Sequence, residues 1–186
     1  MWLDDRLGFA EVTIAMTRLQ ALLHELSQPS LLCPASDGSA PSLMMIVPLE
    51  EQHSLGGMAA AAHLRRLGVS VCLCLGQSND EIMQKISSRQ FDMVAISAAN
   101  SEKLEMVREL VRMVRGAMRA PAPVVIGGNV VARMPDAKAL TGADFATTDP
   151  REALRAFGLR LRQPAHVPLG GERGMSAMTE RAEHAG

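Results

Sequence analysis

His53 is the residue whose neighbours most clearly suggest chemistry. It stands two residues after Glu51 and three before Gly56, and Gly57 follows directly. Histidine is the commonest metal ligand, and its ligating nitrogen is fixed when the other ring nitrogen donates to a carboxylate, which Glu51 could supply. The two glycines would let the backbone approach a large ligand closely. The pattern predicts a metal-binding histidine, and the alternative is a surface histidine beside an accidental glutamate.

Small residues after two later apolar runs could complete a cavity for the same ligand. Ser97 and Ser101 lie in the stretch SAANS, and Gly127 and Gly128 open the stretch GGNVV. Serine offers a hydroxyl donor, and paired glycines remove side chains where a flat group could slide between a strand and a helix. Each feature alone is common in α/β proteins. Their order after successive apolar runs indicates a binding site.

Short apolar runs alternate along the chain with stretches able to form helices. The runs are Leu43–Pro48, Val69–Leu75, Met93–Ser97 and Val124–Gly127, with Ala143–Thr147 as a weaker fifth. Such alternation predicts a parallel sheet covered by helices on both faces. Five units of this length predict an α/β, flavodoxin-like (Rossmann-like) fold with strand order 2-1-3-4-5. Ligands of such folds bind beyond the carboxyl ends of the strands, where the His53 motif falls.

Composition divides the chain into four segments. Residues 1–28 carry a helical stripe of apolar residues and predict a short N-terminal helical segment. Residues 29–41 hold prolines and serines typical of a linker. Residues 42–162 form the α/β domain, and residues 163–186, rich in Gly, Ala and charge, predict a flexible tail. The abrupt opening at a helix suggests a shorter translation product or a trimmed chain.

The overall composition narrows the classes of function. The 186 residues include 19 basic and 20 acidic side chains, so no basic field advertises binding to nucleic acid or membranes. The three cysteines match neither a disulfide framework nor a zinc set, which predicts a reduced, cytoplasmic chain. No signal peptide is evident, and no apolar run approaches the roughly 20 residues that span a bilayer.

These motifs resemble the cobalamin (vitamin B12)-binding domain, whose signature is D-x-H-x-x-G, then S-x-L, then G-G. The first element matches Glu51–Gly56, the second Ser97–Ala99 and the third Gly127–Gly128. The resemblance covers roughly Ser42 to Arg162 and implies the same five-stranded sheet.

The resemblance also implies a role for each site residue. His53 would be the lower axial ligand of cobalt in place of the cofactor's own benzimidazole, and Glu51 would accept a hydrogen bond from it. The other implied residues surround the displaced benzimidazole tail: Gly56, Ser97, Ala99, Ser101, Gly127 and Gly128. Glutamate replaces the usual aspartate at Glu51, which lengthens the partner by one methylene. Alanine replaces the usual leucine at Ala99, which opens space in the pocket.

The segment Asp4 to Leu23, DDRLGFAEVTIAMTRLQALL, is similar to the segment upstream of the cobalamin-type domain in AerR/PpaA-type antirepressors of purple photosynthetic bacteria. This resemblance implies a light-responsive regulator, not an enzyme, that binds adenosyl-, methyl- or hydroxocobalamin. It would control a transcription repressor of photosynthesis genes by protein–protein contact, without binding DNA itself. The upper ligand would come from the N-terminal helix, where Trp2, Met16 and His24 are candidates.

Three alternatives remain open. The same His53 could bind heme in a heme sensor. The domain could be the corrinoid carrier subunit of a methyltransferase, although such carriers have a complete N-terminal helical bundle and this chain has room for one substantial helix before its linker. The domain could also bind no ligand and serve as a protein interaction surface.

Overall fold

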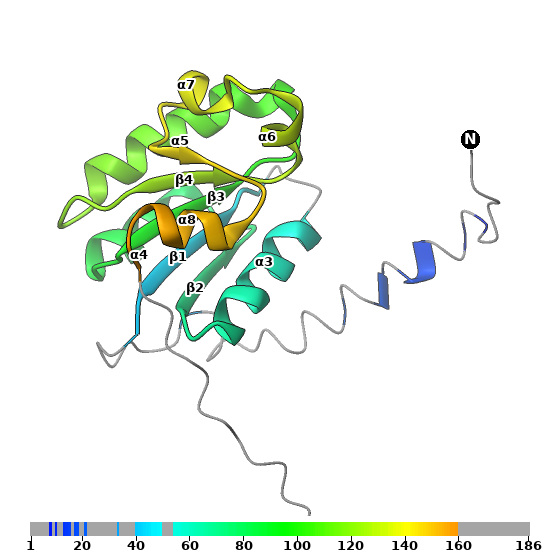
Figure 1. The fold of residues 1–186 in the computed structure, drawn as a ribbon, viewed down its shortest axis with the longest axis horizontal. Coiled ribbons are helices and arrows are strands. Elements are labelled where there is room, and N and C mark those ends of the chain that lie inside the picture. The colour runs from blue at the N-terminus through cyan, green and yellow to red at the C-terminus, as the bar shows by residue number, and fades with distance from the viewer. Residues whose placement is uncertain are drawn as a thin grey trace, which may run out of the picture.

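The computed structural model describes residues 40–49 and 54–159, together with residues 8, 10, 13–15, 17, 18, 21 and 33. Among the isolated residues, those between 10 and 21 are helical, and the Thr17 hydroxyl donates to the Thr13 carbonyl at 2.9 Å. The main body is a single sheet between two layers of helices (Figure 1). The predicted N-terminal, linker and tail segments lie largely outside the described residues, so the predicted domain division stays a prediction.

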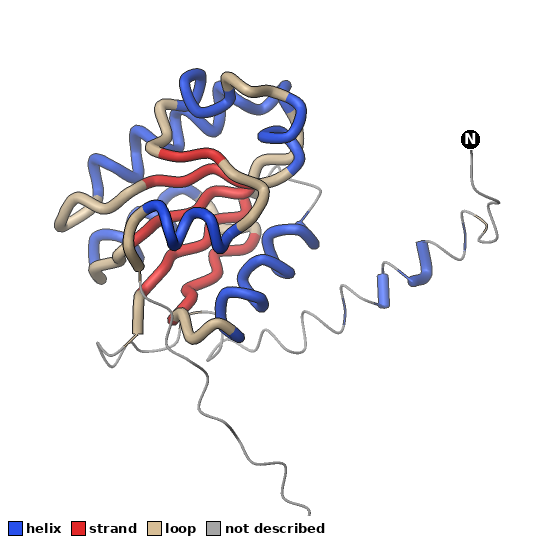
Figure 2. The backbone as a smooth tube through the Cα atoms, viewed as in Figure 1, coloured by secondary structure: helices blue, strands red, loops and turns tan. Residues whose placement is uncertain are grey.

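Five parallel strands form the sheet in the order β2-β1-β3-β4-β5, which confirms the predicted fold class (Figure 2). The strands are β1 (Ser42–Val47), β2 (Ser70–Leu75), β3 (Met93–Ser97), β4 (Val124–Gly127) and β5 (Phe145–Ala146). Strand order reverses between β1 and β3, the position at which open α/β sheets bind ligands. The fifth strand is shorter than the predicted Ala143–Thr147, although the Asp144 and Thr147 N–H groups on either side of it also donate to carbonyls of β4.

Helices follow the strands and cover both faces of the sheet (Figure 1). They are α3 (Ser54–Arg66), α4 (Asn79–Ser88), α5 (Leu104–Ala117), α6 (Asn129–Arg133), α7 (Ala137–Thr141) and α8 (Pro150–Ala156), with a 3-10 turn, η1 (Ser101–Lys103), before α5. Apolar side chains of α3 and α8 pack on one face of the sheet, and those of α4 to α7 pack on the other.

The period-2 alternation of the strands assigns their side chains to these two faces. Even-numbered residues of β1, β3 and β4 face the layer of α4 to α7: Met44, Ile46, Val94, Ile96, Val124 and Ile126. Odd-numbered residues of the same strands face α3 and α8: Leu43, Met45, Val47, Met93, Ala95 and Val125. The central strands are therefore apolar on both faces, as expected for a buried parallel sheet.

Local capping fixes where two helices begin. Ser78 precedes α4, where its hydroxyl accepts from the Glu81 N–H at 3.4 Å and its own N–H donates to the Glu81 carboxylate at 2.8 Å. This reciprocal pair is a capping box. Asp149 precedes α8 and accepts from the Arg151 N–H at 2.9 Å, and Pro150 occupies the first turn, where proline is well tolerated.

Two of the cysteines lie side by side. Cys33 and Cys72 of β2 are 39 residues apart in the sequence, and their Cα atoms are 3.9 Å apart. Cysteine spacing alone could not show that residue 33 returns to the side of β2, and the reduced state of the cysteines stays a prediction. Cys74 is free and buried, and burial raises the pKa of its thiol to about 11.

In the part of the chain that the structure describes, no helix has both the length and the apolar character needed to cross a membrane.

Candidate functional site

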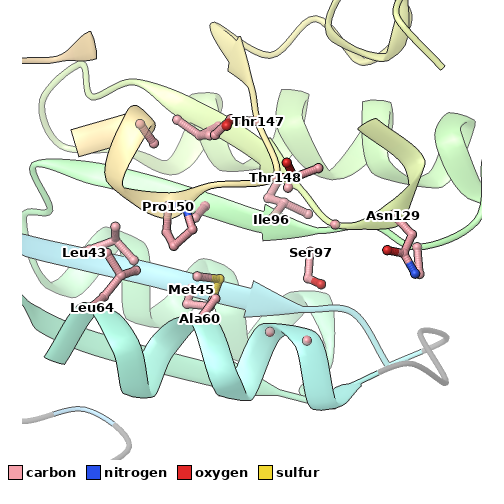
Figure 3. Close-up of a pocket in the computed structure, with 18 of the residues that line it drawn as sticks. Leu43, Met45, Ala60, Leu64, Ile96, Ser97, Asn129, Thr147, Thr148 and Pro150 are labelled. Carbon is pink, nitrogen blue, oxygen red and sulfur yellow. The ribbon is translucent and has the colours of Figure 1, made fainter. Parts of the chain in front are cut away.

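A slot of about 480 Å³ lies between α3 and α8, over the face formed by β1, β3 and β4 (Figure 3). It opens at the carboxyl edge of the sheet, on both sides of the point where strand order reverses. Its volume falls within the roughly 300–1,000 Å³ of small-molecule sites in proteins. The slot is therefore large enough to hold a sizeable organic group.

Strand register arranges the floor of the slot in three rows. Leu43 and Met93 pair in the bottom row, and Met45, Ala95 and Val125 pair across the middle row. Ser97 and Gly127 pair in the top row, at the ends of β3 and β4. Because residues two apart on a strand share a face, one side of β3 supplies all three rows.

Small side chains keep the slot open. Ala95 remains half-buried in a central strand because no helix side chain fills the space above it. Ala60 of α3 faces the slot from one wall (Figure 3). Ala153 of α8 lines the opposite wall. Leu64, one turn beyond Ala60, closes the deep end. Larger residues at the three alanines would occupy the volume that the slot now offers.

Polar side chains gather at the mouth of the slot. Ser97 belongs to the top row, and the other three follow strand ends: Asn129, Thr147 and Thr148. Among the described residues the Ser97 hydroxyl has no hydrogen-bond partner, although the residue is only 9% exposed. Because Ser97 lines the slot, this hydroxyl is available to a ligand. The Thr147 hydroxyl is already engaged, since it donates to the Glu152 carboxylate at 2.6 Å and accepts from the Asp149 N–H at 3.0 Å.

The described lining of the slot carries no charged side chain. The two helices that wall the slot are joined on the outer surface, where the Arg151 guanidinium of α8 donates to His63 Nε2 of α3 at 3.1 Å. The slot itself suits a neutral, largely apolar group.

Four glycines of the predicted site play different physical roles. A Cβ on Gly57 would lie 2.4 Å from a Val47 methyl, so Gly57 lets α3 pack closely on β1. A Cβ on Gly128 would lie 2.4 Å from the Ala98 carbonyl oxygen, and its φ of +109° also favours glycine. A Cβ on Gly127 would be tight against the Thr147 carbonyl, at 3.2 Å.

Gly56 is the exception among these glycines. No atom lies within 4 Å of a Cβ added there, and the residue is exposed at the mouth of the slot. Nothing in the packing of the described residues requires glycine at this position. The lack of a side chain at Gly56 therefore leaves room at the mouth rather than within the core.

The structure brings most of the described candidate residues to one slot. Those that line it are Gly56, Ser97, Ala99, Gly127 and Gly128. Ser101 is exposed at the start of η1 and is not part of the lining. The chain turns at this point, where the Asn100 side chain caps η1 by accepting from the Glu102 N–H at 3.2 Å. A contact between Ser101 and the tail of the ligand stays a prediction.

Glu51 and His53 lie outside the described residues, so the proposed metal ligand and its partner stay predictions. His53 directly precedes Ser54, the first residue of α3. Among the described residues no group of three or more His, Cys, Asp or Glu side chains is placed to hold a metal ion.

Sequence reasoning missed several residues that form the slot. Thr147, Thr148 and Pro150 follow the fifth strand, where the same rule about carboxyl ends of strands could have found them. The floor residues Met45 and Ala95 were recognisable only as strand residues, since their face depends on which helices lie above them. Ala60 carried no signal in the sequence.

A family model described as the B12 binding domain matches residues 41–157 of the chain. The chain belongs to the B12-binding domain family. The match begins at the start of β1 and ends just after α8, so it includes every element that forms the slot.

Two known proteins are similar to this B12-binding domain chain. An uncharacterised 20.5 kDa protein in the bchF-crtJ intergenic region of Rhodobacter capsulatus is 36% identical over 160 residues, which cover 85% of this chain and 82% of that protein. A crystal structure of a novel cobalamin-binding protein from Desulfitobacterium hafniense DCB-2 superimposes with a TM-score of 0.55 and 19% identity, over 81% of this chain and 69% of that one. The second likeness shows the shared fold.

The slot of this B12-binding domain fits the nucleotide tail of cobalamin in shape and chemistry. The tail ends in a flat, methylated aromatic base, and the slot is deep, apolar and bounded by small residues. The unpartnered Ser97 hydroxyl at the mouth could bond to a polar atom of the tail. The described residues therefore fit the group that the family name implies.

Proposed function

We propose that this protein is a cobalamin-binding sensory regulator in the cytoplasm, in which His53 is the lower axial ligand of cobalt. The observation that carries the proposal is the position of the slot. It opens at Gly56 and Ser97, beside the helix that directly follows His53. A ligand whose tail fills the slot would bring its metal to the carboxyl edge, where the E-x-H-x-x-G motif enters α3.

Each described residue then has a simple task. The floor and walls of the slot hold the tail and exclude water from it. Ser97 donates or accepts a hydrogen bond at the mouth, and Gly56 leaves space above it. Glu51 accepts a hydrogen bond from His53 and so fixes which ring nitrogen faces the metal. Bound alkylcobalamin supplies a cobalt–carbon bond that light can cleave.

We further propose that the bound state controls contact with a transcription repressor of photosynthesis genes. The relative in Rhodobacter capsulatus, which lies in the bchF-crtJ intergenic region, supports this link. The resemblance of Asp4 to Leu23 to the corresponding segment of AerR/PpaA-type antirepressors supports the same role. In this proposal the protein is a binding protein rather than an enzyme, and it acts on DNA only through its partner.

The test is a visible absorption titration of the purified protein, in the dark and after illumination. The ligands are adenosyl-, methyl- and hydroxocobalamin, with hemin in a parallel titration. We expect saturable binding of cobalamin with a spectrum that changes in His53→Ala. His63→Ala is the matched control, because that histidine bonds to Arg151 on the outside of α3 and should leave the spectrum unchanged.

Other results would select one of the alternatives. Binding of hemin alone would indicate a heme sensor, and binding of neither ligand would leave an interaction module. Equal binding of all cobalamin forms, without an effect of light, would argue against light sensing. A spectrum that is the same in His53→Ala and the unmodified protein would refute the assignment of the axial ligand.

A further inference from the structure

The slot separates its polar groups from its apolar depth. Every polar side chain in the described lining belongs to the top row or lies beyond the strand ends: Ser97, Asn129, Thr147 and Thr148. The middle and bottom rows present only apolar side chains: Leu43, Met45, Met93, Ala95 and Val125. The helix residues at the same depth are Ala60, Leu64 and Ala153.

The backbone offers no hydrogen bonds at this depth either. β1 is paired on both sides, with β2 and β3, and β3 is paired with β1 and β4. At the deep end of α3, the Leu64 carbonyl accepts from the Leu67 and Val69 N–H groups at 3.0 and 3.1 Å. A polar atom that reached the middle or bottom row would lose its water without gaining a partner.

The deep rows instead suit an aromatic ring. Met45 places a thioether on the floor (Figure 3), and sulfur contacts favourably with aromatic rings. Val125 and Ala95 beside it add aliphatic surface without hydrogen-bonding groups. Methyl groups on such a ring would bury further apolar area, which strengthens binding.

We propose that the slot selects corrinoids by the base at the end of their tail. It accepts an apolar aromatic base, such as a methylated benzimidazole, and discriminates against a purine whose exocyclic amine and extra ring nitrogens need partners. This inference rests on the proposed cobalamin binding and adds the class of tail that the site takes. The determinants are the apolar residues of the middle row, Met45, Ala95 and Val125.

The experiment compares three corrinoids with the full chain in the hydroxo or aquo form. They are hydroxocobalamin, the equivalent corrinoid with an adenine tail, and cobinamide, which has no nucleotide tail. We expect the adenine-tailed corrinoid to bind at least roughly tenfold more weakly than hydroxocobalamin, because each buried polar group without a partner is costly. Tenfold corresponds to ~1.4 kcal/mol.

The outcomes separate this inference from the proposed function. Equal dissociation constants for the two tailed corrinoids would overturn the selectivity and leave cobalamin binding intact. Failure of all three corrinoids to bind would overturn the proposed function and the inference with it. Tight binding of hydroxocobalamin, with the adenine-tailed form close to cobinamide, would support both.

A matched pair of variants on β4 assigns the selectivity to the slot. Val125→Thr places one hydroxyl in the middle row without a change in shape, and it should reduce the ratio of the two dissociation constants several-fold. Val124→Thr is the control, since the adjacent residue is equally buried but faces the other side of the sheet. It should leave the ratio unchanged.

A ratio that Val125→Thr does not alter would overturn the assignment to the middle row. Circular dichroism and thermal unfolding would verify that each variant folds. If Val125→Thr does not fold, Ala95→Ser tests the same row, because the half-buried Ala95 has open space above it. The same reduction of the ratio is expected.

Discussion

The two faces of the central sheet use the same strands for different purposes. The face toward α4 to α7 is filled: Met44, Ile46, Val94, Val124 and Ile126 are all 0% exposed. The face toward α3 and α8 contains the slot of about 480 Å³. On the filled side, a hollow of about 230 Å³ lies at the carboxyl edge between α4 and α5.

Side-chain size and helix coverage explain the difference. On β3, Ile96 fills one face, while its neighbour Ala95 leaves the other open. α5 supplies a long row of buried residues to the filled face, whereas α8 contributes only Ala153 and Leu154 to the slot face. One face thus contributes mainly to stability and the other mainly to ligand binding. The free energy of unfolding of variants on each face should show this difference.

Ile126→Ala should show the largest loss of stability. Ile126 is fully buried on the filled face, and truncation removes apolar contacts and leaves a cavity that its neighbours cannot fill. We expect a loss of about 2–5 kcal/mol in the free energy of unfolding by chemical denaturation. A loss below about 1 kcal/mol would contradict the claim that this face is tightly packed.

Gly57→Ala should lower the free energy of unfolding, whereas Gly56→Ala should raise it. The Cβ on Gly57 would meet Val47, so α3 would be displaced at a cost of about 1–3 kcal/mol. The Cβ on Gly56 would meet nothing, and alanine favours helix over glycine by up to about 1 kcal/mol. Denaturation of both variants measures the difference. Equal destabilisation by the two would refute the separation between a packing glycine and one that leaves room for the ligand.

The sequence predicted the filled face and the order of the sheet well. Short apolar runs mark all the central strands, and the helical stretches between them favour parallel pairing, so order 2-1-3-4-5 followed from the length and number of the units. The motif residues Gly56, Ser97, Ala99, Gly127 and Gly128 also proved to share one slot. All of them follow strand ends or begin a helix, where position along the chain indicates position in the fold.

The depth of the slot was not predictable in the same way. Whether Ala95 lies beneath a helix side chain or beneath a void depends on how α3 and α8 sit on the sheet. Gly128 had been expected only as a wall of the slot, yet its positive φ and its approach to Ala98 are set by the backbone. Such requirements arise from contacts between segments distant in the sequence, which a pattern of residue types does not contain.

Asp144→Asn should reduce stability on the filled side by about 1 kcal/mol. The Asp144 carboxylate accepts from the Val124 N–H at 2.7 Å and from the Arg115 guanidinium at 2.8 Å. These two bonds connect α5 to the start of β4. The figure is modest because the side chain is 35% exposed and solvent screens the ion pair. Arg115 of α5 thus contacts the residue that precedes β5.

The effect of Asp144 should depend on pH with a defined sign. Burial would raise the pKa of the carboxyl, but the hydrogen bonds from Val124 and Arg115 outweigh it and lower the pKa below its ordinary 3.8. The stability that it contributes is therefore present above pH 3.8 and is lost as the pH falls through the lower folded value. The free energies of unfolding of Asp144→Asn and of the unmodified protein should converge in that acidic range. A difference between them that stays constant down to pH 2 would contradict the assignment to the Asp144 carboxylate.

Ala60→Leu should have the smallest effect on stability and a large effect on binding. Ala60 faces the open slot, so leucine can enter existing space rather than strain a packed core, and a change within about 1 kcal/mol is expected. Ala59→Leu, on the exposed side of the same helix, is the matched control. Binding of hydroxocobalamin should be lost in Ala60→Leu and retained in Ala59→Leu. If Ala60→Leu destabilised the protein as Ile126→Ala does, the hollow face would have to be regarded as part of the packed core, and the contrast between the two faces would fail.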